Sequence, residues 1–152
     1  MNILGIQYNI NQNALEIYVS GCIGNPHCAG CFSPETWNFN QGKPYLEILH
    51  NDITTQINLF NDMINKIMIF GGEPLDQDIK ELRLFLQEIK KFKKEIWLFT
   101  HYDFNIAKQI LGDVITLCDY IKCGAYKEDL KTDDNIQYGV KLATSNQKIY
   151  KL

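Results

Sequence analysis

Short apolar runs alternate with longer amphipathic stretches along most of this chain. The runs 14–19, 66–70 and 95–99 are rich in Ile, Leu, Val, Phe and Trp, the residues that favour strands. After Lys66 the second run is apolar throughout, which is typical of a parallel strand covered on both faces. The expected strands cover residues 3–10, as a short edge strand, then 14–19, 66–70, 95–99, 119–122 and the end of 142–150.

Two long stretches carry apolar residues at spacings of three and four, the pattern of an amphipathic helix. We expect the first helix over residues 45–60 and the second over 78–92. A third helix, which Asp103 can cap, is expected to run to about Leu111. The expected apolar stripes are Leu46, Leu49, Ile53, Ile57 and Phe60 in the first helix, and Ile79, Leu82, Phe85, Leu86 and Ile89 in the second.

The order of these elements predicts the class of fold. Strands that alternate with helices favour parallel βαβ units, and therefore an α/β protein. Because there are few such units, the expected architecture is a small incomplete β/α barrel of parallel strands. We expect a single domain over residues 1–152, with a cysteine-rich loop directly after the first barrel strand, 14–19.

That loop contains the strongest chemical signal of the sequence. Cys22, Cys28 and Cys31 follow a C-x5-C-x2-C spacing, in a loop that also holds Gly24 and Gly30. Thiolates are soft ligands that suit zinc or iron–sulfur clusters. A cubane cluster usually takes four cysteines, so three would leave one iron open for a substrate or cofactor. A structural zinc site formed by the three cysteines and His27 is the alternative, and the loop alone leaves both open.

Two further strand ends carry candidate residues. The run 66–70 leads into Gly71-Gly72-Glu73-Pro74, where the lack of a Cβ allows a backbone to approach a ligand closely, although an ordinary tight turn would look the same. A side chain at Gly72 would then block the ligand while leaving a cluster intact. His101 follows the strand 95–99 and lies near the same edge of the sheet; the alternative, which we favour slightly, is a surface histidine.

Composition and charge narrow the class of protein. Hydrophobic residues make up 45% of 152 residues, enough for one core, and the net charge of −3 gives no footprint for nucleic acid. The apolar runs are far shorter than the roughly 20 residues of a membrane span. Five cysteines, three of them bunched, do not suit a secreted disulfide framework. We therefore expect a cytoplasmic protein in which Cys118 and Cys123 are not ligands.

The order of these motifs resembles the radical S-adenosylmethionine enzymes, and more narrowly the activating proteins of anaerobic, glycyl-radical ribonucleotide reductases. The resemblance covers almost the whole chain, although the family's usual loop is C-x3-C-x2-C, two residues shorter than here. The segments that carry it are Val19-Ser20-Gly21-Cys22, 28–37, Phe70-Gly71-Gly72-Glu73-Pro74-Leu75, 96–100, Asp119-Tyr120-Ile121-Lys122 and Ser145-Asn146-Gln147.

The resemblance implies a function and a set of site residues. Cys22, Cys28 and Cys31 would hold a [4Fe–4S] cluster whose fourth iron binds S-adenosylmethionine. The residues implied in binding that cofactor are Gly30, Cys31 and Phe32 on the adenosyl side, and Gly71, Gly72 and Glu73 at the methionine end. No side chain beyond the cluster ligands is expected to act in catalysis.

The implied reaction is the installation of a glycyl radical, by a 5′-deoxyadenosyl radical, on the large subunit of an anaerobic ribonucleotide reductase. The implied electron donor is a protein such as flavodoxin or ferredoxin. The alternatives are action on another glycyl-radical protein or a small molecule, or a non-catalytic zinc module.

Overall fold

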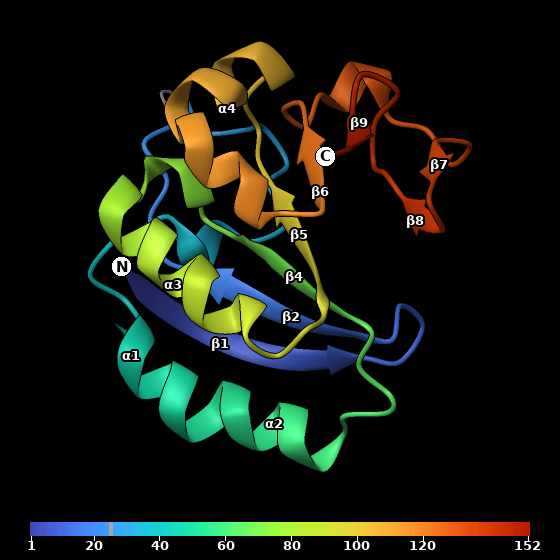
Figure 1. Ribbon diagram of the computed structural model, residues 1–152. Helices are drawn as coiled ribbons and strands as arrows, with labels where there is room; N and C mark the ends of the chain where they lie inside the picture. The colour runs from blue at the N-terminus through green and yellow to red at the C-terminus, as the bar shows by residue number, and fades with distance from the viewer. Residues whose placement is uncertain (25) are drawn as a thin grey trace.

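The computed structural model of the protein describes residues 1–24 and 26–152. Its centre is a seven-stranded sheet in the order β3-β1-β2-β4-β5-β6-β9, in which β2, β4, β5 and β6 are parallel (Figure 1). The strands are β1 (Asn2–Asn9), β2 (Ala14–Val19), β3 (Lys43–Pro44), β4 (Lys66–Gly71), β5 (Glu95–Phe99), β6 (Tyr120–Cys123) and β9 (Lys148–Lys151), with β7 (Ile136–Gln137) and β8 (Val140–Lys141) paired separately.

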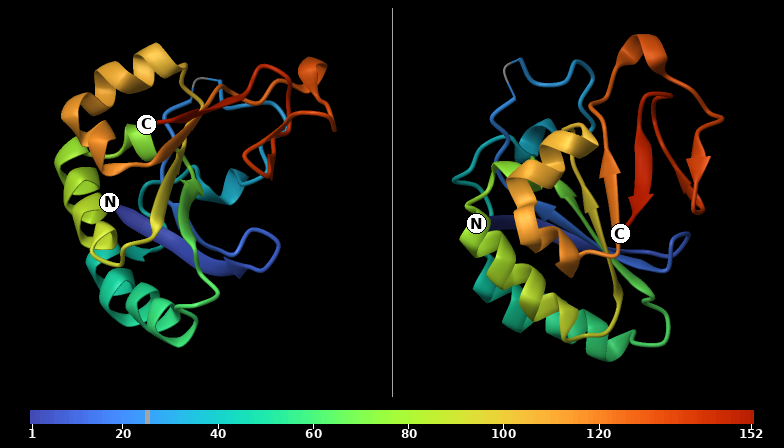
Figure 2. Two further views of the ribbon diagram at one scale, coloured as in Figure 1. Left: turned by 45° about the vertical axis from the view of Figure 1, so that its right-hand side comes forward. Right: turned by 45° about the horizontal axis from the view of Figure 1, so that its top comes forward.

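The helices cover one face of the sheet, and the segment that contains β7 and β8 lies toward the other (Figure 2). The helices are α1 (Tyr45–Ile48), α2 (Thr54–Leu59), α3 (Ile79–Lys90) and α4 (Phe104–Leu111), and a π-helical turn, Leu49–Ile53, joins the first two. The helical face buries the larger core, which includes Leu15, Ile17, Phe85 and Leu98. A smaller cluster with Met68 and Trp97 forms under β8 on the opposite face.

The α/β class is confirmed, but the expected set of parallel strands is wrong at both ends of the sheet. β1 and β3 pair antiparallel on one side, and β9 pairs antiparallel with β6 on the other. Two-residue β3 is the edge strand, while β1 is a full strand of eight residues. The cysteine loop follows β2, the strand over residues 14–19, as expected. The partial barrel stays a prediction.

The expected helix over residues 45–60 forms, but its buried stripe differs at both ends, since Phe60 follows the last helical residue and is exposed. Tyr45 and Ile48 are buried, whereas Leu46 is 50% exposed. A π turn contains one more residue than an α turn, so it rotates the preceding turn relative to the following one. Helix α3 buries Leu82, Phe85, Leu86 and Ile89 as expected, and the carboxylate of Asp78 caps its N-terminus. Asp103 stands at the N-cap of α4, but its side chain makes no capping hydrogen bond.

Parallel pairing brings the carboxyl ends of four strands to one edge of the sheet. In the ladder Val19 lies opposite Gly71, and Phe99 lies opposite Lys122. The loops that follow these residues contain the predicted site residues, and such edges are where ligands bind in open α/β sheets. In the part of the chain that the structure describes, no helix is both long and apolar enough to cross a membrane.

Candidate functional site

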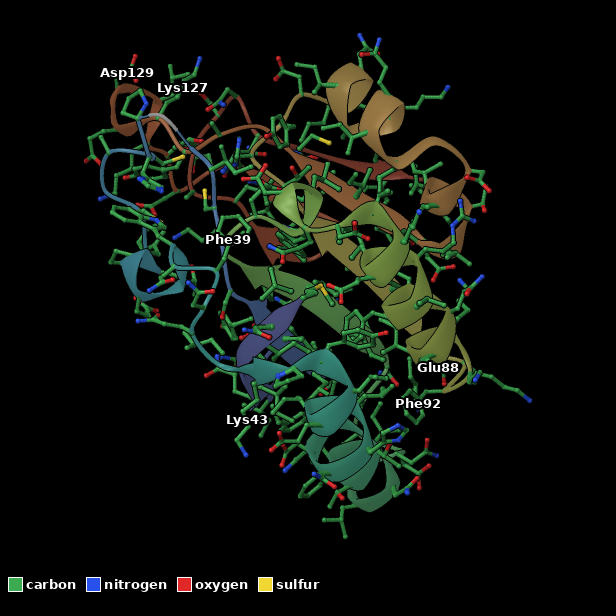
Figure 3. All side chains as sticks on the ribbon, turned by 90° about the vertical axis from the view of Figure 1, so that its left-hand side faces the viewer. Phe39, Lys43, Glu88, Phe92, Lys127 and Asp129 are labelled. Carbon is green, nitrogen blue, oxygen red and sulfur yellow. The ribbon has the colours of Figure 1, made fainter. Side chains whose placement is uncertain are left out.

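A pocket of about 340 Å³ lies at this edge of the sheet. All three cysteines of the loop line it, and so do Phe32, Gly71, Gly72 and Glu73, which brings together every predicted site residue except Gly30. Gly30 lies next to Tyr126, which itself lines the pocket. The segment that contains Lys127 and Asp129 runs beside the cysteine loop, as Figure 3 shows.

The three thiols lie on one pocket and are the soft ligands that an iron–sulfur cluster requires. Cys22, Cys28 and Cys31 are half-buried free thiols on the same pocket. Among the described residues, no group of three Cys, His, Asp or Glu side chains converges as ligands of one metal ion would. In a [4Fe–4S] cluster the three thiolates bind three separate irons, so their sulfur atoms lie farther apart than those around a single ion.

His27 is engaged elsewhere than in a metal site. Its ring stacks on Trp37, with ring centroids 3.9 Å apart and planes 11° apart. Its Nε2 lies 3.1 Å from the carbonyl oxygen of Cys22, to which it can donate a hydrogen bond. Both contacts position the ring against the loop, which counts against the alternative of a Cys3His zinc site.

Gly72 is required by a contact between two backbones. A Cβ at this position would lie 2.1 Å from the carbonyl oxygen of Gly21, the residue before Cys22. Two hydrogen bonds hold the same approach: the Gly72 N–H donates to Val19 at 2.8 Å, and the Glu73 N–H donates to Gly21 at 2.7 Å. The expectation that a side chain at Gly72 would leave the cluster loop intact therefore changes, because that loop occupies the space.

The same loop is packed tightly on its other side. A Cβ at Gly21 would fall within 2.1 Å of the ring of Phe39, labelled in Figure 3. The Gly21 N–H donates to the carbonyl oxygen of Thr36 at 2.6 Å, and the Cys22 N–H donates to that of Trp37 at 3.1 Å. The start of the cysteine loop is thus held between the Gly-Gly turn and residues 36–39.

Glu73 is a buried carboxylate with all of its bonds directed into the protein. The side chain is 1% exposed. Its Oε1 accepts from the Leu75 N–H at 2.9 Å, and its Oε2 accepts from the His101 N–H at 2.8 Å. The Nδ1 of His101 lies 2.7 Å from the same Oε2. Glu73 therefore joins the ends of β4 and β5.

The preference for His101 as a surface histidine is wrong. Its side chain is 27% exposed and lines the pocket with the cysteines. Hydrogen bonds with the Cys22 side chain and with Glu73 raise the pKa of His101 to about 10, although partial burial acts in the opposite direction. The signal in the sequence that could have placed His101 at the site was the carboxylate of Glu73, directly after Gly71-Gly72. A buried acid requires hydrogen-bond donors, and a neighbouring strand end can supply them.

Two residues between β4 and α3, which the sequence reasoning missed, hold the cysteine loop in place by hydrogen bonds. Asp76 accepts from the Ile23 N–H at 2.6 Å and from the Tyr102 hydroxyl at 2.7 Å. The side-chain amide of Gln77, 9% exposed, lies within 3.1–3.3 Å of three carbonyl oxygens, those of Ser20, Gly21 and Glu73. Nothing in the local pattern before α3 distinguishes these side chains from ordinary polar turn residues.

Cys118 and Cys123 lie apart from the pocket. Both are buried, at 4% and 3% exposure, and burial raises the pKa of each thiol to about 12. A protonated thiol in the core behaves as a small apolar group. That neither residue is a ligand stays a prediction.

Comparison with known proteins adds to this geometry. A family described as a 4Fe-4S single cluster domain matches residues 13–150, which include the cysteine loop, the Gly-Gly turn and the pocket. The chain belongs to this family. Membership in the 4Fe-4S single cluster domain family supports an iron–sulfur cofactor, one of the two alternatives that the cysteine loop alone leaves open.

Named relatives of this 4Fe-4S domain protein agree with the resemblance. An anaerobic ribonucleoside-triphosphate reductase-activating protein of Escherichia coli (strain K12) is 28% identical over 139 residues, 90% of this chain and 86% of that protein. Proteins of the same name are 29% identical in Enterobacteria phage T4, over 76% of this chain and 72% of the relative, and 27% identical in Pasteurella multocida (strain Pm70), over 89% and 85%.

Proposed function

We propose that this chain is a cytoplasmic, single-domain activating enzyme of the radical S-adenosylmethionine class, which installs a glycyl radical on an anaerobic ribonucleotide reductase. The observation that carries the proposal is the pocket in which three cysteines face the Gly-Gly-Glu strand end. The named relatives supply the partner: each is a reductase-activating protein, and each is similar over most of its length.

Cys22, Cys28 and Cys31 would hold three irons of a [4Fe–4S] cluster and leave the fourth open. S-adenosylmethionine would bind there, with its methionine end toward Gly71, Gly72 and Glu73 and its adenosyl side toward Gly30, Cys31 and Phe32. Because Glu73 directs its carboxylate into the protein, backbone groups near Gly72 would contact the ligand. The hydrogen-bonded frame of Asp76 and Gln77 would keep the loop in register with that strand end.

With one electron from a donor such as flavodoxin or ferredoxin, a bound cluster would supply the reductive cleavage of the sulfur–C5′ bond of S-adenosylmethionine, which would release methionine and a 5′-deoxyadenosyl radical able to take a hydrogen atom from a glycine. The chain's own part is to orient the cofactor and to exclude water. Phe32, 75% exposed at the pocket, offers an apolar rim for a docked protein to cover. A protein substrate that completes the chamber fits this open rim.

The test combines the anaerobically reconstituted protein, a reductant, S-adenosylmethionine and the reductase of the same organism, followed by electron paramagnetic resonance. We expect a glycyl doublet on the reductase that is lost when its target glycine is changed to alanine. The Cys28→Ala variant should lose iron and the doublet, whereas the matched Cys118→Ala variant should keep both. Cofactor cleavage with demonstrated reductase binding, but without the doublet, would contradict the proposed substrate.

A further inference from the structure

His101 connects a buried carboxylate to the first cysteine of the loop. It lies two residues after the end of β5, and its imidazole lines the pocket together with Cys22. Hydrogen bonds join the ring to Glu73 and to the side chain of Cys22. The Nδ1 atom lies 2.7 Å from Oε2 of Glu73, so Nε2 is the ring nitrogen that faces the Cys22 sulfur.

The imidazole of His101 is held in this position from two sides. The backbone N–H of His101 donates to Oε2 of Glu73 at 2.8 Å, and the other oxygen of that buried carboxylate accepts from the Leu75 N–H at 2.9 Å. On the other side the ring packs against the ring of Tyr102, with centroids 4.2 Å apart. The Tyr102 hydroxyl donates to Asp76 at 2.7 Å. The protein's own contacts therefore fix the ring.

The segment that holds the ring also holds the backbone on both sides of Cys22. The Glu73 N–H donates to the carbonyl oxygen of Gly21 at 2.7 Å, and the carboxylate of Asp76 accepts from the Ile23 N–H at 2.6 Å. The residue before Cys22 and the residue after it are thus tied to residues 73–76. Because His101 rests on the same residues, the imidazole and the Cys22 sulfur keep a set relative position.

The ring stands between Glu73 and a sulfur that would be anionic in a loaded site, since a cysteine binds a metal as the thiolate. Two flanking anions favour the protonated imidazole, which has an N–H on each nitrogen and donates in both directions. A neutral ring with its proton on Nδ1 would instead direct a lone pair at the thiolate. The arrangement is therefore that of a cationic donor aimed at a cluster ligand.

We propose that His101 donates a hydrogen bond from Nε2 to the sulfur of Cys22 in the loaded site and thereby makes the cluster easier to reduce, an inference that rests on the proposed function. A donor to a ligand sulfur stabilises the added negative charge of a reduced cluster, so the reduction potential rises. One electron then passes more readily from the flavodoxin or ferredoxin, which is oxidised, and His101 keeps both protons. His101 is a positioning residue that acts through Cys22.

The experiment measures the midpoint potential of the cluster in reconstituted protein without S-adenosylmethionine, by redox titration followed by electron paramagnetic resonance. His101→Phe keeps a ring beside Tyr102 but has no donor, and His101→Gln offers a neutral amide N–H in place of the imidazole. His27→Phe is the matched control, because the Nε2 of His27 lies against the carbonyl oxygen of Cys22. Iron content and the urea midpoint of each variant establish that the cluster and the fold are intact.

We expect His101→Phe to lower the ratio of reduced to oxidised cluster about 10-fold at a fixed potential, which is about 59 mV for one electron. The reason is the loss of a hydrogen bond to a charged group that strengthens on reduction. The ratio in His101→Gln should fall only about threefold, because a neutral donor makes roughly half as strong a bond. The ratio in His27→Phe should change less than about twofold.

Pulsed electron paramagnetic resonance of the reduced cluster, with histidine labelled by ¹⁵N, gives a second readout that serves if His101→Phe takes up no cluster. We expect a weak nitrogen coupling in the wild type that is lost in His101→Gln. A coupling as strong as that of iron-bound nitrogen would make His101 a ligand and overturn the inference, as would a coupling that persists in His101→Gln.

An unchanged potential in His101→Phe, or an equal fall in His101→Gln or His27→Phe, would also overturn it. Failure of the proposed function looks different: the potentials would shift as expected, while the reduced wild type cleaved no S-adenosylmethionine.

Discussion

Replacement of Gly72 by alanine tests how the cysteine loop is held. The added Cβ would lie 2.1 Å from the carbonyl oxygen of Gly21, where an ordinary contact needs at least 3.4 Å. The obstacle is backbone, which cannot rotate away as a side chain would. The loop would have to move by about 1 Å relative to the turn, and Cys22 would move with it. We therefore expect Gly72→Ala to lose both stability and iron.

The expected size of the loss follows from the contacts that the shift would break. Forcing an extra methyl into a packed site costs about 1–3 kcal/mol. The hydrogen bonds from Gly72 N–H to Val19 and from Glu73 N–H to Gly21 contribute about 1 kcal/mol each. The total of about 3–5 kcal/mol is a large part of the roughly 5–15 kcal/mol that stabilises a domain. The urea midpoint should fall by about 1.5–2.5 M.

Gly5→Ala is the matched control for this substitution. It adds the same methyl to strand β1, where nothing lies within 4 Å of the new Cβ. Its urea midpoint should stay the same or rise slightly, by the equivalent of about 0.5 kcal/mol, because alanine loses less backbone entropy on folding. The assay is urea unfolding of the apoprotein with iron counted after reconstitution. If Gly72→Ala matches Gly5→Ala in both measurements, the loop is not held against the turn as described.

Three further predictions concern single side chains. In the apoprotein at pH 8, Cys118 and Cys123 should react with iodoacetamide at least about 100-fold more slowly than the loop cysteines, because a pKa of about 12 leaves little thiolate; equal rates would contradict their burial. His27→Phe, which keeps a ring on Trp37, should retain the cluster, whereas His27→Ala should bind less iron; complete loss of metal in His27→Phe would favour the zinc site. Burial lowers the pKa of Lys122 to about 8, so Lys122→Met, which buries no charge, should have a higher urea midpoint than the wild type at pH 7. The difference between the two midpoints should shrink between pH 8 and 10.5, because over this range the folded wild type loses the Lys122 proton while the unfolded chain retains it. A difference that does not depend on pH would contradict this.

Much of the fold could be predicted because local patterns decide it. Each segment's own pattern shows which of its residues are buried. This holds for the apolar runs of β2, β4 and β5 and for the helical spacing of apolar residues in α3. The α/β class follows from their alternation. The direction of β1 and β9 does not, since antiparallel pairing at a sheet edge depends on partners that are distant in sequence. The π turn in the first helix likewise has no local signature.

The candidate site divides in the same way. The sequence by itself determined the chemical groups: three clustered thiols in one loop and a strand end without side chains at Gly71 and Gly72. Only the tertiary structure decided what surrounds them. Parallel pairing of β4, β5 and β6 brings His101 to Glu73 and directs Lys122 into the pocket. These contacts join residues far apart in the chain, so their geometry and charge exist only once the sheet has formed.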